Sequence, residues 1–79
     1  MTHDLVQFAR SLQLDSLESG WNKAVAAPTA AETPSYAAVI DLLCEKEMAS
    51  RALVMATAMI DALAARDQTD AALELGFRV

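Results

Sequence analysis

The hydrophobic residues of this 79-residue chain recur mostly at intervals of three and four positions, the spacing of an amphipathic helix. Two sets near the N-terminus have this spacing: Leu5, Phe8, Ala9 and Leu12, then Leu17, Trp21 and Val25. The pattern predicts one helix over residues 3–12 and a second over residues 16–26. Gly20 falls inside the second helix, where it costs about 1 kcal/mol relative to alanine.

Capping residues indicate where the next helices begin. Asp15 can cap the second helix, with Glu18 three positions on as in a capping box. Residues 27–33 contain a proline and small side chains, which predicts a linker between antiparallel helices. Thr33 followed by Pro34 is an N-cap residue and then a proline at the first helical position, so a third helix begins here.

A helical pattern continues over residues 34–66, but its apolar face changes phase within residues 44–50. Tyr36, Val39 and Ile40 share one face of the first half, and the large side chains of the second half lie roughly 90° or more away. The helix either breaks near Ser50, or continues and buries opposite sides in its two halves. Because neither proline nor glycine forces a break, we expect one long helix, with or without a kink. Two opposite buried faces require a second chain, so we expect dimerisation to complete the bundle.

The composition favours helices throughout. Alanine is the commonest residue, β-branched residues are few, and no Asn-Gly or Asp-Gly hairpin turn occurs. Thr69 and Asp70 open a short C-terminal helix, predicted over residues 70–75, that Gly76 ends. The sequence therefore predicts an all-α fold, a small bundle of 3–5 helices forming a single domain over residues 1–79.

The chain is acidic, and this charge restricts the partners that we expect it to bind. Eleven acidic residues against six basic ones give a net charge of −5, and the arginines form no cluster, so we expect no direct nucleic-acid binding. A basic protein partner fits this charge better. The apolar stretch 52–65 is shorter than the ~20 residues of a membrane span and contains Asp61, so we expect no membrane insertion. A first segment without a secretory pattern and a single cysteine favour the cytoplasm.

Candidate catalytic chemistry is sparse. Cys44 is the single cysteine and has no histidine near it in sequence, so neither a disulfide nor an activated nucleophile is expected. His3, the single histidine, lies near the N-terminus, and we expect no metal site. Glu45 and Glu47 are two positions apart and point in different directions on a helix. No glycine-rich loop follows a strand. We predict no catalytic residues, no cofactor and no enzymatic activity.

The apolar half of the long helix is the candidate binding surface. Methionine is common on adaptable binding surfaces, although ordinary core packing is the first interpretation of these methionines and of Trp21, and a binding surface the second. The predicted partner-binding residues are Met48, Val54, Met55, Met59, Ile60, Leu63 and Trp21. The predicted function is that of a small acidic adaptor or regulator that binds a protein and forms a homodimer. A small acidic chaperone for a secreted or aggregation-prone protein, and an acidic inhibitor of a nucleic-acid-binding protein, are the alternatives.

One ordered set of residues resembles a known family. The segments "LVQFARSLQLDSLESGWN" and "PSYAAVIDLLCEKEMASR", within residues 5–51, are similar to the N-terminal helical region of IstB-like transposition helper ATPases. The matching positions are Leu12, Leu14, Leu17, Trp21, Ser35, Tyr36, Leu42, Leu43, Glu45, Glu47 and Arg51. The ATPase domain of that family is absent, and the chain turns apolar after Arg51. The resemblance therefore implies a protein-docking module without ATPase activity or DNA binding.

Overall fold

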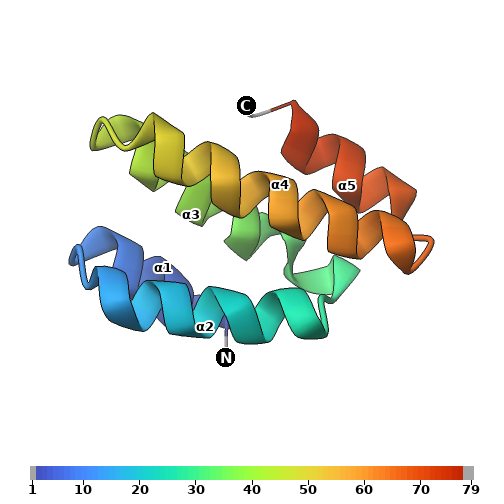
Figure 1. The fold of residues 1–79 in the computed structure, drawn as a ribbon, viewed down its shortest axis with the longest axis horizontal. Coiled ribbons are helices and arrows are strands. Elements are labelled where there is room, and N and C mark those ends of the chain that lie inside the picture. Colours follow the sequence, from blue (N-terminus) through green and yellow to red (C-terminus); the bar gives the residue numbers. More distant parts are fainter. Residues whose placement is uncertain (1, 78–79) are drawn as a thin grey trace.

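A computed structural model describes the backbone of residues 2–77 and the side chains of residues 4–77, so the side chain of His3 lies outside the described residues. Every regular element in this range is helical, and the predicted all-α fold is confirmed (Figure 1). The elements are the α-helices Thr2–Arg10 (α1), Leu14–Ala26 (α2), Thr33–Glu45 (α3), Ala49–Ala65 (α4) and Thr69–Gly76 (α5), and the 3-10 turn Ala30–Glu32 (η1).

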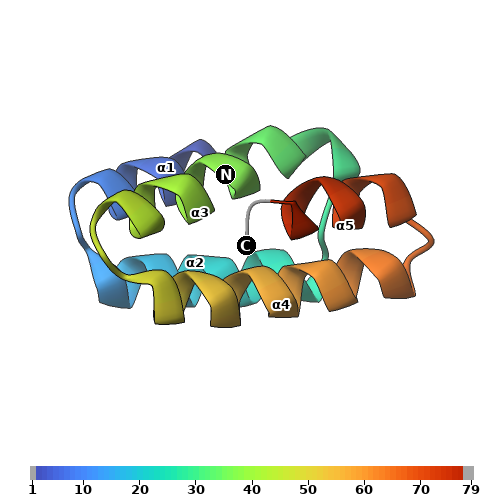
Figure 2. The same ribbon diagram turned by 90° about the horizontal axis from the view of Figure 1, so that it is seen from above.

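The helices alternate between two layers. Figure 2 shows α1, α3 and α5 in one layer and α2 and α4 in the other. α1 packs on α2 and α3, and α4 packs on α2, α3 and α5. The chain therefore forms one helix pair, α1–α2, a second pair, α3–α4, stacked beside it, and a fifth helix, α5, that packs on α4 and α3.

One hydrophobic cluster fills the space between the layers. Its large members with almost no exposed surface are Trp21, Tyr36, Leu17, Ile40, Leu43, Met59, Leu63, Leu75 and Val39. The chain exposes 4608 Å², and a compact 8.5 kDa monomer is expected to expose about 4,700 Å². The Cα radius of gyration is 11.1 Å, against about 12 Å expected for this length. A second copy is therefore not needed to complete the core, and the expected homodimer stays a prediction.

The expected continuous helix over residues 34–66 is wrong. α3 ends at Glu45 and α4 begins at Ala49, so the change of phase marks a corner between two helices that face one core. Glu47 has a φ of 61° and holds the left-handed conformation that reverses the chain. The Met48 N–H donates to the Leu43 carbonyl at 2.9 Å, and the Glu47 N–H donates to the Cys44 carbonyl at 3.1 Å. Together these two bonds form a Schellman helix end.

The same corner occurs three times. Leu12, Glu47 and Asp67 have φ values of 58°, 61° and 60°. In each corner the next N–H donates to a carbonyl five positions back at 2.9 Å: Gln13 to Phe8, Met48 to Leu43, and Gln68 to Leu63. Since none of the three left-handed residues is glycine, hydrogen bonds and core packing hold conformations that the residues themselves disfavour.

The helix starts differ in detail from the predicted caps. α2 begins at Leu14, and its N-cap residue is Gln13, whose side chain makes no capping hydrogen bond. Asp15 lies in the first turn of the helix and not at its N-cap, so the expected Asp15–Glu18 capping box is wrong. Thr33 is the first residue of α3, and Pro34 lies in its first turn as expected. The Thr33 hydroxyl donates to the Ala30 carbonyl at 2.7 Å and ties η1 to the start of α3.

Gly20 has a packing role that its place inside a helix does not reveal. A Cβ atom at this position would come within 2.6 Å of Leu5 Cδ2, on the neighbouring helix α1. Leu5 is buried in the core. The glycine therefore leaves room for the buried Leu5 side chain against α2, and this packing offsets the cost of glycine within the helix.

Tyr36 anchors the connector between the two helix pairs. Its hydroxyl accepts a hydrogen bond from the Thr29 N–H at 3.2 Å and donates one to Glu32 Oε2 at 3.4 Å. Burial raises the pKa of Tyr36 above its usual value of 10.0, the Thr29 N–H opposes this rise, and the nearby Glu32 carboxylate adds to it. The neutral phenol is thus the form that this connector stabilises.

The corner at Glu47 predicts opposite effects for two matched glycine substitutions. Glu47→Gly relieves a left-handed conformation and should raise the free energy of unfolding by about 0.5–1 kcal/mol. Glu45→Gly removes the same charge at the end of α3, where glycine disfavours the helix, and should lower the free energy of unfolding by a similar amount, about 0.5–1 kcal/mol. Urea denaturation of both variants measures the difference. A loss of stability in both would mean that a continuous helix crosses this segment.

Tyr36 predicts a change of stability at high pH. Because its folded pKa is raised, the stabilisation from the neutral phenol is complete below pH 10 and is lost as the pH rises through the folded pKa. The stability difference between the native chain and Tyr36→Phe, which cannot ionise, should therefore shrink as the pH rises above 10. Urea denaturation of both proteins at pH 8 and at successive values above 10 measures it. A difference that stays constant would contradict the assignment.

Candidate interaction surface

The predicted partner-binding residues do not form one surface. Met59 and Leu63 are fully enclosed, Trp21 and Met55 are buried, and Met48 and Ile60 are half-buried against the core. Val54 alone is strongly exposed, at 70%. The expectation of an adaptable methionine face is therefore corrected: Met55 and Met59 pack in the chain's own core, because the corner at Glu47 turns α4 back onto α3.

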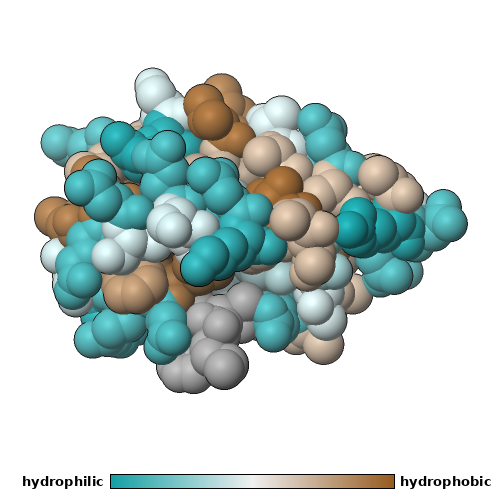
Figure 3. Space-filling view, turned by 60° about the horizontal axis from the view of Figure 1, so that its bottom comes forward, coloured by the Kyte–Doolittle hydropathy of each residue, from teal (hydrophilic) through white to brown (hydrophobic). Residues whose placement is uncertain are grey.

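Exposed apolar side chains gather instead on the α4–α5 hairpin. Four of the five large hydrophobic side chains that are exposed in the described range lie on or directly after these helices: Leu53, Val54, Leu73 and Phe77. The fifth, Leu12, lies at the α1–α2 corner. Figure 3 shows that on one side of the molecule apolar groups reach the surface as separate patches between hydrophilic ones.

Helical spacing sorts the exposed residues of α4 into two stripes. Val54 and Ala58 line a shallow groove of about 150 Å³ between α4 and α2. Leu53, Thr57 and Ile60 follow one another at four and three positions, so they form a second stripe on the other flank of α4. α5 packs on α4 but not closely on α2, so this second stripe lies toward α5.

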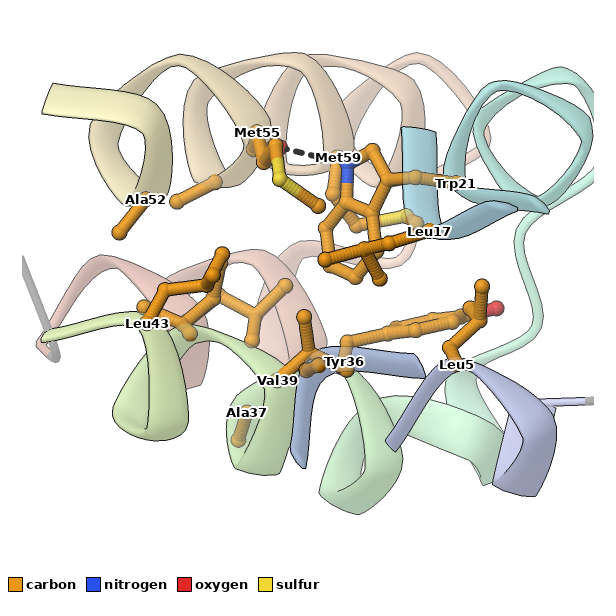
Figure 4. Close-up of a cluster of buried hydrophobic side chains, with 14 of the residues drawn as sticks. Leu5, Leu17, Trp21, Tyr36, Ala37, Val39, Leu43, Ala52, Met55 and Met59 are labelled. Atoms are coloured by element: carbon orange, nitrogen blue, oxygen red, sulfur yellow. Dashed lines mark hydrogen bonds between the residues drawn. The ribbon is translucent and has the colours of Figure 1, made fainter. Parts of the chain in front are cut away.

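Trp21 forms the floor of the groove between α2 and α4. Its indole Nε1–H donates to the Met55 carbonyl at 3.0 Å, the bond drawn in Figure 4. At the rim, the Arg51 guanidinium lies 3.5 Å from the Glu18 carboxylate, and both side chains are largely exposed. Such an exposed ion pair contributes at most about 1 kcal/mol to stability.

The described residues hold few elements of a catalytic or metal site. No three histidine, cysteine, aspartate or glutamate side chains in this range lie close enough to hold a metal ion. Cys44 is an exposed free thiol. None of the helices in the described range combines the length and hydrophobicity needed to cross a bilayer.

Sequence reasoning found Val54 but missed Leu53, Leu73 and Phe77. The buried residues of α5 are Ala71, Ala72 and Leu75, and Leu73 and Phe77 lie on the opposite side of the helix. A short helix with apolar residues on both sides was the signal in the sequence that could have revealed this surface. For Leu53 the signal was weaker, because its alanine-rich surroundings resemble a solvated face.

Comparisons with known proteins were made against family models, curated proteins and solved structures, and none of them finds a match. The resemblance of residues 5–51 to IstB-like helper ATPases thus stays a prediction.

Proposed function

We propose that this chain is a non-enzymatic protein–protein interaction module that acts as a small acidic adaptor or regulator. The observation that carries the proposal is the concentration of exposed apolar side chains on α4 and α5, namely Leu53, Val54, Leu73 and Phe77. Single exposed apolar residues are ordinary on soluble proteins, so the proposal depends on four of the five in the described range lying on or directly after two adjacent helices.

The exposed apolar residues of α4 and α5 are not needed to fill the core, which supports the proposal. The large side chains that fill the core come from all five helices of the described range, so the exposed residues of α4 and α5 are surplus to folding. Leu53 and Val54 lie next to each other and are 54% and 70% exposed. Their replacement by polar residues should leave the fold intact, which separates binding from stability. The expected cytoplasmic location and self-association remain part of the proposal.

Substitution of the exposed α4 residues tests the function. The Leu53→Glu, Val54→Glu variant places two carboxylates on this surface and should reduce capture of native-host partner proteins by about tenfold or more. The measurement is quantitative mass spectrometry of proteins retained by the immobilised native chain and by the variant. Partner binding is expected to weaken because each apolar contact is replaced by a charge that must be desolvated.

A matched control places a glutamate where the surface is already polar. Ser19 is exposed on α2, away from α4 and α5, so Ser19→Glu should retain the same partners as the native chain. Circular dichroism should give helical spectra for both variants that match the native spectrum. Undiminished capture by the Leu53→Glu, Val54→Glu variant would show that this surface does not carry the function.

A further inference from the structure

The outward side of α4 carries a row of exposed residues. Arg51, Val54, Ala58 and Asp61 follow one another at three, four and three positions, which places them on one stripe of the helix, and all four are exposed. The buried residues of α4 are centred on the other side of the helix, against the core. This stripe, which we call the Val54 stripe, therefore takes little part in folding the chain.

The Val54 stripe borders the groove between α2 and α4. Arg51, Val54 and Ala58 line this groove, opposite Glu18 of α2, and the helical spacing continues the row to Asp61. Val54 is 70% exposed, so its side chain projects from the helix. Ala58, one turn further on, has only a methyl group. The stripe thus offers one projecting apolar side chain and, beside it, one shallow place that could receive such a side chain.

The residues of the Val54 stripe are arranged symmetrically about Ala56. Arg51 lies five positions before Ala56, and Asp61 lies five positions after it. Val54 and Ala58 lie two positions before and two positions after the same residue. In an antiparallel pair of two such helices that cross at Ala56, Arg51 of each copy would lie beside Asp61 of the other. Val54 of each copy would lie over Ala58 of the other, whereas a parallel pair would bring like charges together.

We propose that the Val54 stripe binds a second copy of this chain, through an antiparallel pair of α4 helices with a two-fold axis near Ala56. This inference rests on the proposed function, of which self-association is a part, and it names the surface and the register. A two-fold contact uses the same patch on both copies, so the patch must be complementary to itself. Arg51 and Asp61 meet this condition, because their contact forms twice and fixes both the direction and the register of the pair.

Charge complementarity in the Val54 stripe is local. Each copy has a net charge of −5, which opposes association of any two copies. Within the stripe, however, the Asp61 carboxylate is matched by the Arg51 guanidinium. Arg51 lies 3.5 Å from Glu18, and both side chains are largely exposed. A guanidinium has five N–H donors, so Arg51 can bind the second copy's carboxylate as well. We therefore expect a reversible dimer that depends on protein concentration.

Such a dimer leaves the other flank of α4 uncovered. Leu53, Thr57 and Ile60 form the stripe on that flank, and Leu53 is 54% exposed. The Val54 stripe then contacts the second copy, while Leu53 stays exposed for a different protein. Self-association and partner binding can therefore be tested by different substitutions.

Charge reversal tests the pairing and its direction. Arg51→Glu creates two like-charge contacts in the dimer, and so does Asp61→Lys. Each variant should therefore raise the dissociation constant of the dimer by at least about tenfold in sedimentation equilibrium of the full chain. The doubly substituted chain, Arg51→Glu with Asp61→Lys, has opposite charges at both contacts again and should dimerise like the native chain. An equimolar mixture of the two singly substituted chains should also dimerise, because each brings the charge that the other lacks.

Two uncharged substitutions locate the contact on α4. Val54→Ser removes the projecting apolar side chain and should raise the dissociation constant of the dimer by about tenfold. Leu53→Ser removes an exposed leucine from the other flank and should leave this constant unchanged. Circular dichroism of all these variants should match the native spectrum, because every substituted residue is exposed.

Several results would overturn the inference. A native chain that stays monomeric up to about 1 mM has no such contact. A dimer that survives both single charge reversals, or a doubly substituted chain that does not dimerise, would exclude the antiparallel pairing. Weakening by Leu53→Ser in place of Val54→Ser would put the contact on the other flank.

Failure of partner binding would appear separately from failure of the dimer. Arg51→Glu retains Leu53 and Val54, so as a monomer it should still capture the same partner proteins as the native chain. Undiminished capture by the Leu53→Glu, Val54→Glu variant would reject the partner-binding surface, whereas the charge-reversal series alone decides the pairing of Arg51 with Asp61.

Discussion

The burial of Trp21 between the two helix pairs is the interaction on which the rest of the fold depends. The side chain comes from α2, its Nε1–H donates to the Met55 carbonyl of α4 at 3.0 Å, and its ring lies edge-on to Tyr36 of α3, with centroids 5.7 Å apart. Truncation of a buried tryptophan to alanine costs about 3–5 kcal/mol, against a total of about 4–12 kcal/mol for a chain of this length. One residue thus holds both pairs in a single core.

This packing also explains why two large apolar residues of α4, Leu53 and Val54, lie outside the core. At equivalent positions 35 residues apart, Leu17 and Trp21 of α2 correspond to Ala52 and Ala56 of α4, and all four are buried. The large side chains of α2 fill the space that the alanines of α4 leave, which brings the two helices close. Leu53 and Val54 of α4 then lie outside the core and are exposed.

The sequence was sufficient for the all-α class and for the existence of α1, α2 and α5, because apolar spacing follows the helical period, but it predicted α3 and α4 as one helix. It also located the change of phase at residues 44–50, but the break was not expected, because Glu47 reverses the chain without glycine or proline. The packing reason for Gly20 depends on Leu5, which lies on another helix and is invisible to local patterns. The exposed apolar residues of α4 and α5 were largely missed for the same reason: whether Met59 or Leu53 faces the core depends on where α3 and α5 lie.

Hydrogen exchange of the Trp21 indole N–H tests the central claim that the two helix pairs form one cooperative unit. Because this proton is buried and bonded to the Met55 carbonyl, it should exchange only through global unfolding. Its opening free energy should therefore equal that of the most protected backbone amides of α3 and α4. Exchange of the indole at a much lower opening free energy, with those amides still protected, would mean that the pairs separate without unfolding and would contradict the account.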